Sequence, residues 1–296
     1  GSENEDLNEL IHKAEQVMYA QRRKYAMRGD SSPRRPGRPE YLDGLLREFR
    51  QSKFVVYLQP LYGVEQGAVI GAEALVRRIG EDGSVCAPFE FVHMMEEENL
   101  ISVVDYEMLE QSCRLLRDVG QRWPGFQLAC NMSRNTLAEL DYLDRIDDIL
   151  TRTGVDHSQL IFEVTESSRG LQLESIEDRL NALKARGIAV AVADKGTESS
   201  CLEMLYLPQL DLVKIDRSLI SKANHGPREQ AVIGSLIDLC HKLGLGCVAE
   251  GIETKEQGQL LKSLGCDRLQ GYYFGRPMPP EEFFARFRPG AKEHRI

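Results

Sequence analysis

The sequence predicts an α/β fold in the form of a (β/α)-barrel. Amphipathic stretches at helical spacing, such as 171–186, 229–243 and 255–264, separate most of a series of short apolar runs. Near-continuous apolar strands that alternate with helices are typical of a parallel sheet covered by helices, and eight such units close a barrel. The eight runs that predict strands are Phe54–Leu61, Val69–Val76, Gln127–Met132, Leu160–Val164, Ile188–Ala193, Leu212–Ile215, Gly246–Ala249 and Leu269–Phe274.

The connection between the first two runs departs from this pattern. Only the segment Gly63–Gly67 joins them, and a crossover between parallel strands needs a dozen or more residues. We therefore expect these two strands to be antiparallel.

The amino-terminal segment is predicted to lie outside the barrel domain. Residues 4–29 carry apolar side chains at helical spacing, and residues 30–39 form a basic, proline-rich stretch that is typical of a linker. We therefore expect a helix with a linker over residues 1–40 and one domain over residues 41–290.

Composition excludes several classes of protein. The formal net charge of −9 argues against a nucleic-acid polymer as partner, because such binding needs a basic face. The chain shows neither a long apolar span nor a signal-peptide pattern, so the domain is expected in the cytoplasm. Membrane attachment of a longer protein is left open.

Cysteine spacing predicts buried thiols. The seven cysteines form no CxxC pair and lie mostly in apolar runs, which favours free thiols in a reducing compartment and disfavours zinc.

Polar residues, most of them acidic, interrupt or close these apolar runs, where a barrel gathers its functional groups. One such carboxylate alone is more often a helix cap or an ion-pair partner, but several together need cations to stay ionised. Carboxylates with one amide suit Mg²⁺ or Mn²⁺. A metal-dependent phosphoester site is therefore predicted, with its substrate open. The residues concerned are Glu73, Asn131, Glu163, Glu166, Asp194, Lys214, Asp216, Glu250, Glu253 and Gln270.

Seven sequence elements, in order, resemble the EAL-domain family of cyclic di-GMP phosphodiesterases. The family fold is a modified TIM (β/α)8 barrel with an antiparallel first strand. Residues 14–19, followed by a basic stretch, resemble the last helix of a GGDEF domain, with an ordinary leader helix as the alternative. The EAL-like elements are Tyr57-Leu58-Gln59-Pro60, Glu73-Ala74-Leu75-Val76-Arg77, Asn131-Met132-Ser133, Phe162-Glu163-Val164-Thr165-Glu166, Lys214-Ile215-Asp216, Ala249-Glu250-Gly251-Ile252-Glu253 and Gln270-Gly271-Tyr272.

The resemblance implies a role for each matching residue. Metal ligands would be Glu73, Asn131 and Glu163 at a first cation and Asp194 at a second, both Mg²⁺ or Mn²⁺. Catalysis would use Glu73, with Lys214 and Glu250 handling the attacking water and Glu253 ordering the loop after the fifth strand. The residues implied to contact cyclic di-GMP are Gln59, Arg77, Gln270, Gly271 and Tyr272.

One element departs from the family pattern. In active members the fifth strand and the loop after it read Asp-Asp-Phe-Gly-Thr-Gly. This chain reads Ala193-Asp194-Lys195-Gly196-Thr197-Glu198 at the same place. Ala193 offers no ligand atom, and Glu198 replaces a glycine that can adopt positive φ. Lys195 could supply a cation near the remaining acids. Whether Ala193 is natural or engineered stays open.

Three functions remain compatible with these residues. The favoured one is a cyclic di-GMP-binding signalling domain whose hydrolysis is impaired or absent owing to Ala193. The alternative is an active Mg²⁺- or Mn²⁺-dependent phosphodiesterase that yields pGpG, and a ligand-free interaction module is the third. An upstream GGDEF or sensory domain and a homodimer are expected partners.

Overall fold

The structure is a computed structural model that describes residues 53–80, 82–98, 100–120, 122–165, 173–194, 205–222 and 226–290. The predicted amino-terminal helix and linker, together with Glu166 and the loop residues Lys195 to Glu198, lie outside the described residues.

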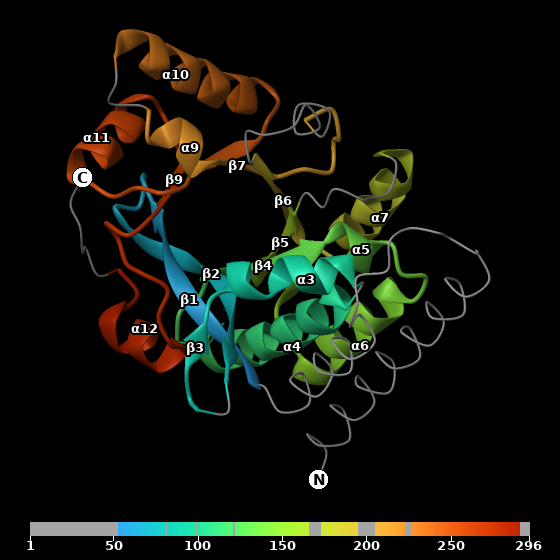
Figure 1. The fold of residues 1–296 in the computed structure, drawn as a ribbon. Coiled ribbons are helices and arrows are strands. Elements are labelled where there is room, and N and C mark those ends of the chain that lie inside the picture. The colour runs from blue at the N-terminus through green and yellow to red at the C-terminus, as the bar shows by residue number, and fades with distance from the viewer. Residues whose placement is uncertain are drawn as a thin grey trace, which may run out of the picture. The chain divides into compact units, whose positions relative to one another are not determined.

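Within the described residues, nine strands form one mixed sheet, and eight of them close into a barrel (Figure 1). The order is β1-β9-β8-β7-β6-β5-β4-β2, with a β1–β2 pairing that completes the circle and with β3 added to β2. All eight predicted strands are present. Their bounds are β1 Lys53–Gly63, β2 Ala68–Ile79, β4 Gln127–Ser133, β5 Leu160–Thr165, β6 Ala189–Asp194, β7 Leu212–Ile215, β8 Gly246–Ala249 and β9 Arg268–Gln270, with β3 at Val85–Cys86.

The first strand runs against its neighbour in the barrel, as the short connection predicts. β1 pairs with β9 in antiparallel register, with Leu61 opposite Gln270, whereas β2 pairs with β4 in parallel and every following neighbour up to β9 is also parallel. The carboxyl ends of seven strands therefore share one end of the barrel.

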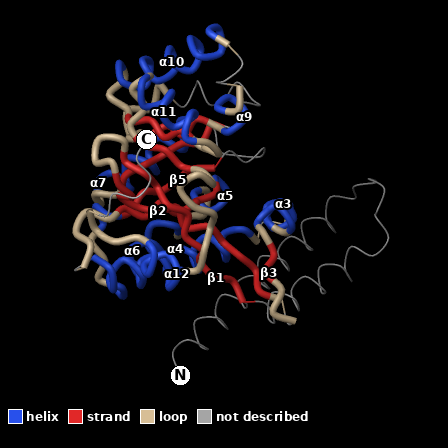
Figure 2. Tube along the Cα trace, turned by 90° about the vertical axis from the view of Figure 1, so that its left-hand side faces the viewer, coloured by secondary structure: helices blue, strands red, loops and turns tan. Residues whose placement is uncertain are grey.

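Helices follow most of the parallel strands. In Figure 2 the red strands are flanked by blue helices, and α10 and α11 lie near one another in the upper part of the view. Described helices are α3 Val92–Glu97, α4 Ile101–Gly120, α5 Arg134–Leu137, α6 Tyr142–Thr153, α7 Leu173–Ala185, α9 Arg217–Ile220, α10 Pro227–Lys242, α11 Lys255–Ser263 and α12 Pro280–Arg286, with 3-10 turns η1 Pro88–Glu90 and η2 His157–Gln159.

The prediction for the last strand was wrong at its carboxyl end. The apolar run extends to Phe274, but β9 stops at Gln270 because the chain turns at Gly271, whose carbonyl accepts the amides of Phe274 and Gly275. A Cβ at Gly271 would lie 2.2 Å from the backbone of Ile252, so the segment after β9 packs directly on the segment after β8.

The chain divides into two compact units. One comprises residues up to Val55 together with Val76–Val104, and the other comprises Val56–Leu75 together with Asp105 onward. The first unit contains β3, α3 and the Phe54–Phe91 ring contact. The second contains the barrel strands up to Leu75 and from β4 onward, and it carries the site described below.

Free cysteines are confirmed among the described residues. Six are free, five of them buried and Cys86 half-buried, while Cys201 lies outside the described residues. No helix among the described residues has the length and apolar character needed to cross a membrane.

Candidate active site

The interior of the barrel changes from apolar to polar over a distance of two residues. One buried layer consists of Leu61, Ala129, Ile161, Ala191, Leu212 and Val248. Because side chains on a strand alternate with a period of two, residues two positions further toward the same end share the interior face. Those next positions with described side chains are Gln59 on the antiparallel strand, and then Asn131, Glu163, Lys214 and Glu250. Together with Glu73 and Gln270, the polar members form what we call the polar layer.

Lys214 lies at the centre of this layer. Its Nζ is 2.6 Å from Glu163 Oε2, 2.6 Å from Glu250 Oε1 and 2.9 Å from Glu73 Oε2. The side chains of Lys214 and Glu163 are each only 5% exposed, whereas that of Glu250 is 26% exposed. One buried ammonium therefore serves three carboxylates that come from β2, β5 and the end of β8.

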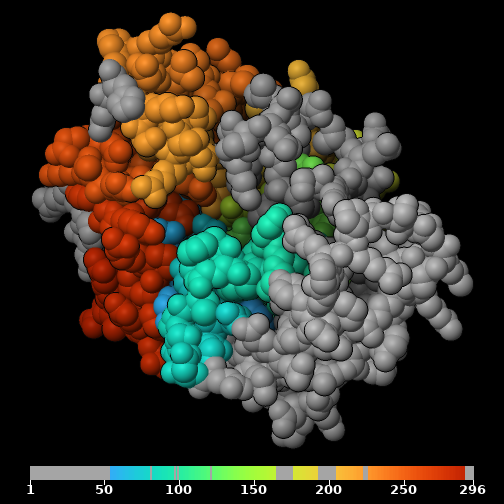
Figure 3. All heavy atoms as spheres, viewed as in Figure 1, coloured from blue at the N-terminus to red at the C-terminus, as the bar shows by residue number. Residues whose placement is uncertain are grey.

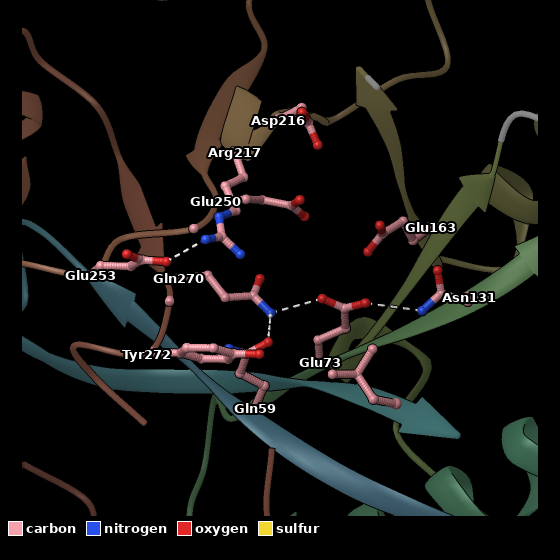
Figure 4. Close-up of a pocket in the computed structure, with 13 residues that line it drawn as sticks. Gln59, Glu73, Asn131, Glu163, Asp216, Arg217, Glu250, Glu253, Gln270 and Tyr272 are labelled. Carbon is pink, nitrogen blue, oxygen red and sulfur yellow. Dashed lines mark hydrogen bonds and ion pairs between the residues drawn. The ribbon is translucent and has the colours of Figure 1, made fainter. Parts of the chain in front are cut away.

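Two amides fix the orientation of Glu73. The Gln270 amide donates to Glu73 Oε2 at 2.7 Å and to Gln59 Oε1 at 3.2 Å, and Asn131 Nδ2 donates to Glu73 Oε1 at 3.0 Å (Figure 4). Gln59 in turn donates to the carbonyl of Gly275. Glu73 is thereby held by hydrogen bonds from β4 and β9 in addition to its contact with Lys214.

The ionisation of these groups reflects burial and mutual charge. Burial, followed by the negative charge of Glu73, raises the pKa of Glu163 to about 8. Burial opposes ionisation of Glu73 as well, but Lys214, Asn131 and Gln270 outweigh it and lower the pKa of Glu73. Burial likewise opposes the charge on Lys214, but the surrounding carboxylates hold its pKa well above its ordinary value.

An ion pair forms the rim above the polar layer. Arg217 follows Asp216, which caps the short helix α9, and its guanidinium lies 2.6 Å from the Glu253 carboxylate. In Figure 3 the orange surface of α9 lies beside the orange-red surface of the following segments. Gly251 has a φ of 72°, and a Cβ there would lie 2.3 Å from Arg217 Cγ. The close contact between Arg217 and the chain after β8 therefore depends on glycine at position 251.

The polar layer and the rim enclose a cavity of about 360 Å³, which lies within the range of small-ligand sites. Figure 4 shows the carboxylates of Glu163 and Glu250 directed toward its middle. Tyr272 is 48% exposed and lies under the Arg276 guanidinium at 4.2 Å from the ring centroid. The lining residues are Gln59, Glu73, Leu75, Asn131, Glu163, Asp216, Arg217, Glu250, Gly251, Glu253, Gln270, Gly271 and Tyr272.

The structure brings together most of the residues that the sequence predicts for the site. Arg77 and Asp194 are not among the residues that the structure places in the pocket. Arg77 belongs to the first unit, where its guanidinium donates to the carbonyl of Val76. Asp194 ends β6, with its backbone paired to Ile215, and its side chain lies outside the described part of the chain. The roles of both residues stay predictions.

Arg217 is a pocket residue that the sequence analysis missed. It directly follows the Lys-x-Asp element, at the first position of α9, and this adjacency was the available signal. Its partner Glu253 lies 36 residues away, so no local pattern indicates the ion pair.

The donor set fits a divalent cation. Glu73, Glu163 and Glu250 offer carboxylate oxygens within 4.8 Å of one another, and when all three are ionised Lys214 neutralises only one of their charges. A buried excess of negative charge is stabilised by protonation or by a cation. Oxygen ligands of this kind suit hard cations such as Mg²⁺ or Mn²⁺.

Fold and site together define a closed α/β barrel with an acidic pocket at the carboxyl ends of its parallel strands. The chain belongs to the EAL domain family, whose pattern it matches over residues 43–277.

Two relatives of known name illustrate the family. Signaling protein YkoW of Bacillus subtilis is 32% identical over 280 residues, which cover 93% of this chain and 35% of that protein. Cyclic di-GMP phosphodiesterase RocR of Pseudomonas aeruginosa is 32% identical over 239 residues, which cover 81% of this chain and 61% of that protein. The chain therefore spans less than two thirds of either relative.

A solved relative also contains the ligand that the resemblance implies. The structure of the MucR phosphodiesterase in complex with c-di-GMP superposes with a TM-score of 0.74 at 32% identity and covers 83% of this chain and 100% of that chain. The EAL enzyme Bd1971 in its cAMP-bound form has a TM-score of 0.76 at 25% identity and covers 83% of this chain and 69% of that chain.

Proposed function

We propose that this domain binds cyclic di-GMP in the pocket above the polar layer and hydrolyses it weakly or not at all. The convergence of Glu73, Asn131 and Glu163 with the amides of Gln59 and Gln270 in one cavity carries the proposal. The carboxylates and amides provide a place for a cation, and Gly271 and Tyr272 provide backbone and an aromatic face for a nucleotide. Arg77 is proposed to contact a phosphate, for which a guanidinium fork is well shaped.

We propose Mg²⁺ or Mn²⁺ as the cofactor, held by Glu73, Asn131 and Glu163, with Asp194 facing a second cation. When bound, such a cation neutralises phosphate charge and acidifies a coordinated water. The chain itself supplies Lys214, whose ammonium stabilises negative charge, and Glu250, whose partly exposed carboxylate can accept a proton from water. Glu253 keeps Arg217 at the rim through their ion pair.

We propose that the impaired hydrolysis is caused by the alanine at position 193. The backbone of Ala193 in β6 is paired with that of Lys214. Alanine has no side-chain atom that can serve as a metal ligand. Loss of one ligand from a two-metal centre removes stabilisation from the attacking or leaving oxygen of an in-line displacement.

An active phosphodiesterase that yields pGpG is the second candidate, and the intact Lys214–Glu250 contact favours it. A ligand-free module is disfavoured by the preserved cavity. As part of the proposal, the domain acts in the cytoplasm, follows a GGDEF or sensory domain and forms homodimers.

Binding and turnover measured side by side separate these functions. Calorimetry with Ca²⁺ is expected to show cyclic di-GMP binding, while an assay with saturating Mg²⁺ or Mn²⁺ is expected to show little pGpG. Rapid formation of pGpG that chelator abolishes would establish the enzyme instead, and absence of heat in calorimetry would leave only the interaction module.

A further inference from the structure

Four side chains with soft or borderline ligand atoms meet at the amino-terminal ends of β8 and β9, away from the pocket at the carboxyl ends. His241 belongs to the last turn of α10, Cys247 is the second residue of β8, and Cys266 and Asp267 precede β9. We call these four residues the thiol cluster. They come from three segments that are contiguous only in the folded barrel.

The atoms of the thiol cluster are close to one another. Cys247 Sγ lies 3.7 Å from Cys266 Sγ, 3.9 Å from His241 Nε2 and 3.2 Å from Asp267 Oδ2, and His241 Nε2 lies 3.0 Å from Asp267 Oδ2. Tetrahedral zinc sites, with metal–ligand bonds of about 2.0–2.3 Å, separate their ligand atoms by about 3.4–3.8 Å. The three separations among His241, Cys247 and Asp267 lie within about 0.4 Å of this range, and the ligand atoms of these three residues all lie within 4.8 Å of one another.

We propose that the thiol cluster binds a divalent cation of the zinc class through His241, Cys247 and Asp267, with Cys266 beside the ligands. One sulfur, one imidazole and one carboxylate form a three-ligand set that suits zinc rather than magnesium and leaves a fourth position for water. The sequence analysis disfavours zinc because the cysteines lack CxxC spacing, but Cys247 and Asp267 are brought within 3.2 Å of each other across 20 residues by the pairing of β8 with β9.

The thiol cluster is open to solvent on the side of His241 and Asp267. Both thiols are buried, whereas the His241 and Asp267 side chains are 41% and 43% exposed. An incoming ion would meet the imidazole and carboxylate first and the Cys247 sulfur last. Binding forms one metal–sulfur bond and releases the Cys247 thiol proton to solvent.

Local backbone geometry already holds the ligands in place. The turn before Cys266 contains Gly265 at a φ of 87°, and the Cys266 amide donates to the carbonyl of Leu261. The Cys247 amide donates to Asp267 Oδ2 at 2.7 Å, so this carboxylate stays beside β8 with or without an ion. A bound cation would join the end of α10 to two barrel strands.

Cobalt titration tests the proposal on the full, reduced and metal-free chain. One equivalent of Co²⁺ is expected to produce a thiolate-to-cobalt charge-transfer absorption that Zn²⁺ removes. Co²⁺ bound to the carboxylates of the polar layer cannot produce this absorption because those ligands are oxygens. Cys247→Ser is expected to lose the band, while Cys86→Ser, which changes a thiol in the other unit, keeps it.

His241→Ala removes a ligand whose side chain is 41% exposed, so it changes the barrel core less than a change at the buried Cys247. Its Co²⁺ affinity is expected to fall at least ~10-fold, a loss of about 1.4 kcal/mol. The absence of a charge-transfer band in the unmodified chain, its persistence in Cys247→Ser, or unchanged affinity in His241→Ala would each overturn the proposal.

Discussion

Lys214 Nζ lies 2.6 Å from Glu163 Oε2, and both side chains are almost fully buried in the barrel. The same ammonium contacts Glu73 and Glu250, so its charge is shared among three acids. This arrangement stabilises the polar layer without a metal and also leaves negative charge for one to neutralise.

Replacement of Lys214 by methionine is expected to destabilise the metal-free protein. The three carboxylates would keep their burial and lose their cation, and removal of one partner from a buried ion pair costs about 3–5 kcal/mol. Urea unfolding in the presence of chelator measures the loss, and added Mn²⁺ should recover part of it.

Lys184→Met is the matched control for that experiment. Lys184 pairs with Asp211, but both side chains are about one third exposed, so we expect a loss of at most about 1 kcal/mol. Equal losses in the two variants would show that burial among the acids does not determine the contribution of Lys214.

Glu163→Gln is expected to separate stability from metal binding. The raised pKa of Glu163 shows that burial, and then the charge of Glu73, disfavours its ionised form, so a neutral amide of the same size should leave the metal-free protein as stable or more stable. Its Mn²⁺ affinity should fall at least ~10-fold, about 1.4 kcal/mol, in calorimetry. Glu253→Gln, at the rim, should change that affinity less than about 2-fold, equivalent to about 0.4 kcal/mol. Unchanged affinity in Glu163→Gln would remove Glu163 from the ligand set.

Arg77→Ala is expected to weaken cyclic di-GMP binding by about 1.5–3 kcal/mol, the value of a hydrogen bond to a charged group. Arg78→Ala controls for the change in net charge, because the Arg78 guanidinium is engaged with Cys86 Sγ. Calorimetry measures the cyclic di-GMP affinity of both variants. Equal affinities in the two would mean that Arg77 makes no specific phosphate contact.

Gly251→Ala is expected to cost more than the backbone strain of a non-glycine residue at positive φ, because its Cβ would also displace Arg217 at the rim. The strain alone costs about 1–3 kcal/mol for a residue other than glycine. Gly187 has a φ of 80°, and a Cβ added there would meet no atom within 4 Å, so Gly187→Ala is the control variant. If Gly251→Ala loses more cyclic di-GMP affinity than Gly187→Ala, the additional loss is due to displacement of Arg217. Equal losses of affinity in the two variants would exclude that displacement.

Ala193→Asp is expected to raise phosphodiesterase turnover at least ~10²-fold, about 2.7 kcal/mol of transition-state stabilisation, because Lys214 and Glu250 are already in place. Affinity for cyclic di-GMP should change far less. The comparison variant restores phenylalanine at 195 and glycine at 198 and keeps Ala193. Hydrolysis by that loop variant, with Ala193→Asp inactive, would assign the defect to the loop.

Apolar runs, and the polar residues that end them, allowed much of the site to be predicted. The apolar runs located the eight strands, and the residues that end or interrupt them, such as Asn131, Glu163 and Lys214, lie in the pocket or contact its acids. Prediction failed where backbone packing overrides an apolar pattern. The run through Phe274 reads as a strand, but the close contact of Gly271 with Ile252 turns the chain instead.

The sequence by itself determined the strands and the family, because apolar runs and motif order are properties of the local chain. Tertiary structure alone decided which charges meet. Lys214 reaches Glu73 across 141 residues, Arg217 reaches Glu253 across 36, and Cys247 reaches Cys266 across 19. Such distances depend on the register of neighbouring strands and on closure of the barrel, and no local pattern of residues contains that information.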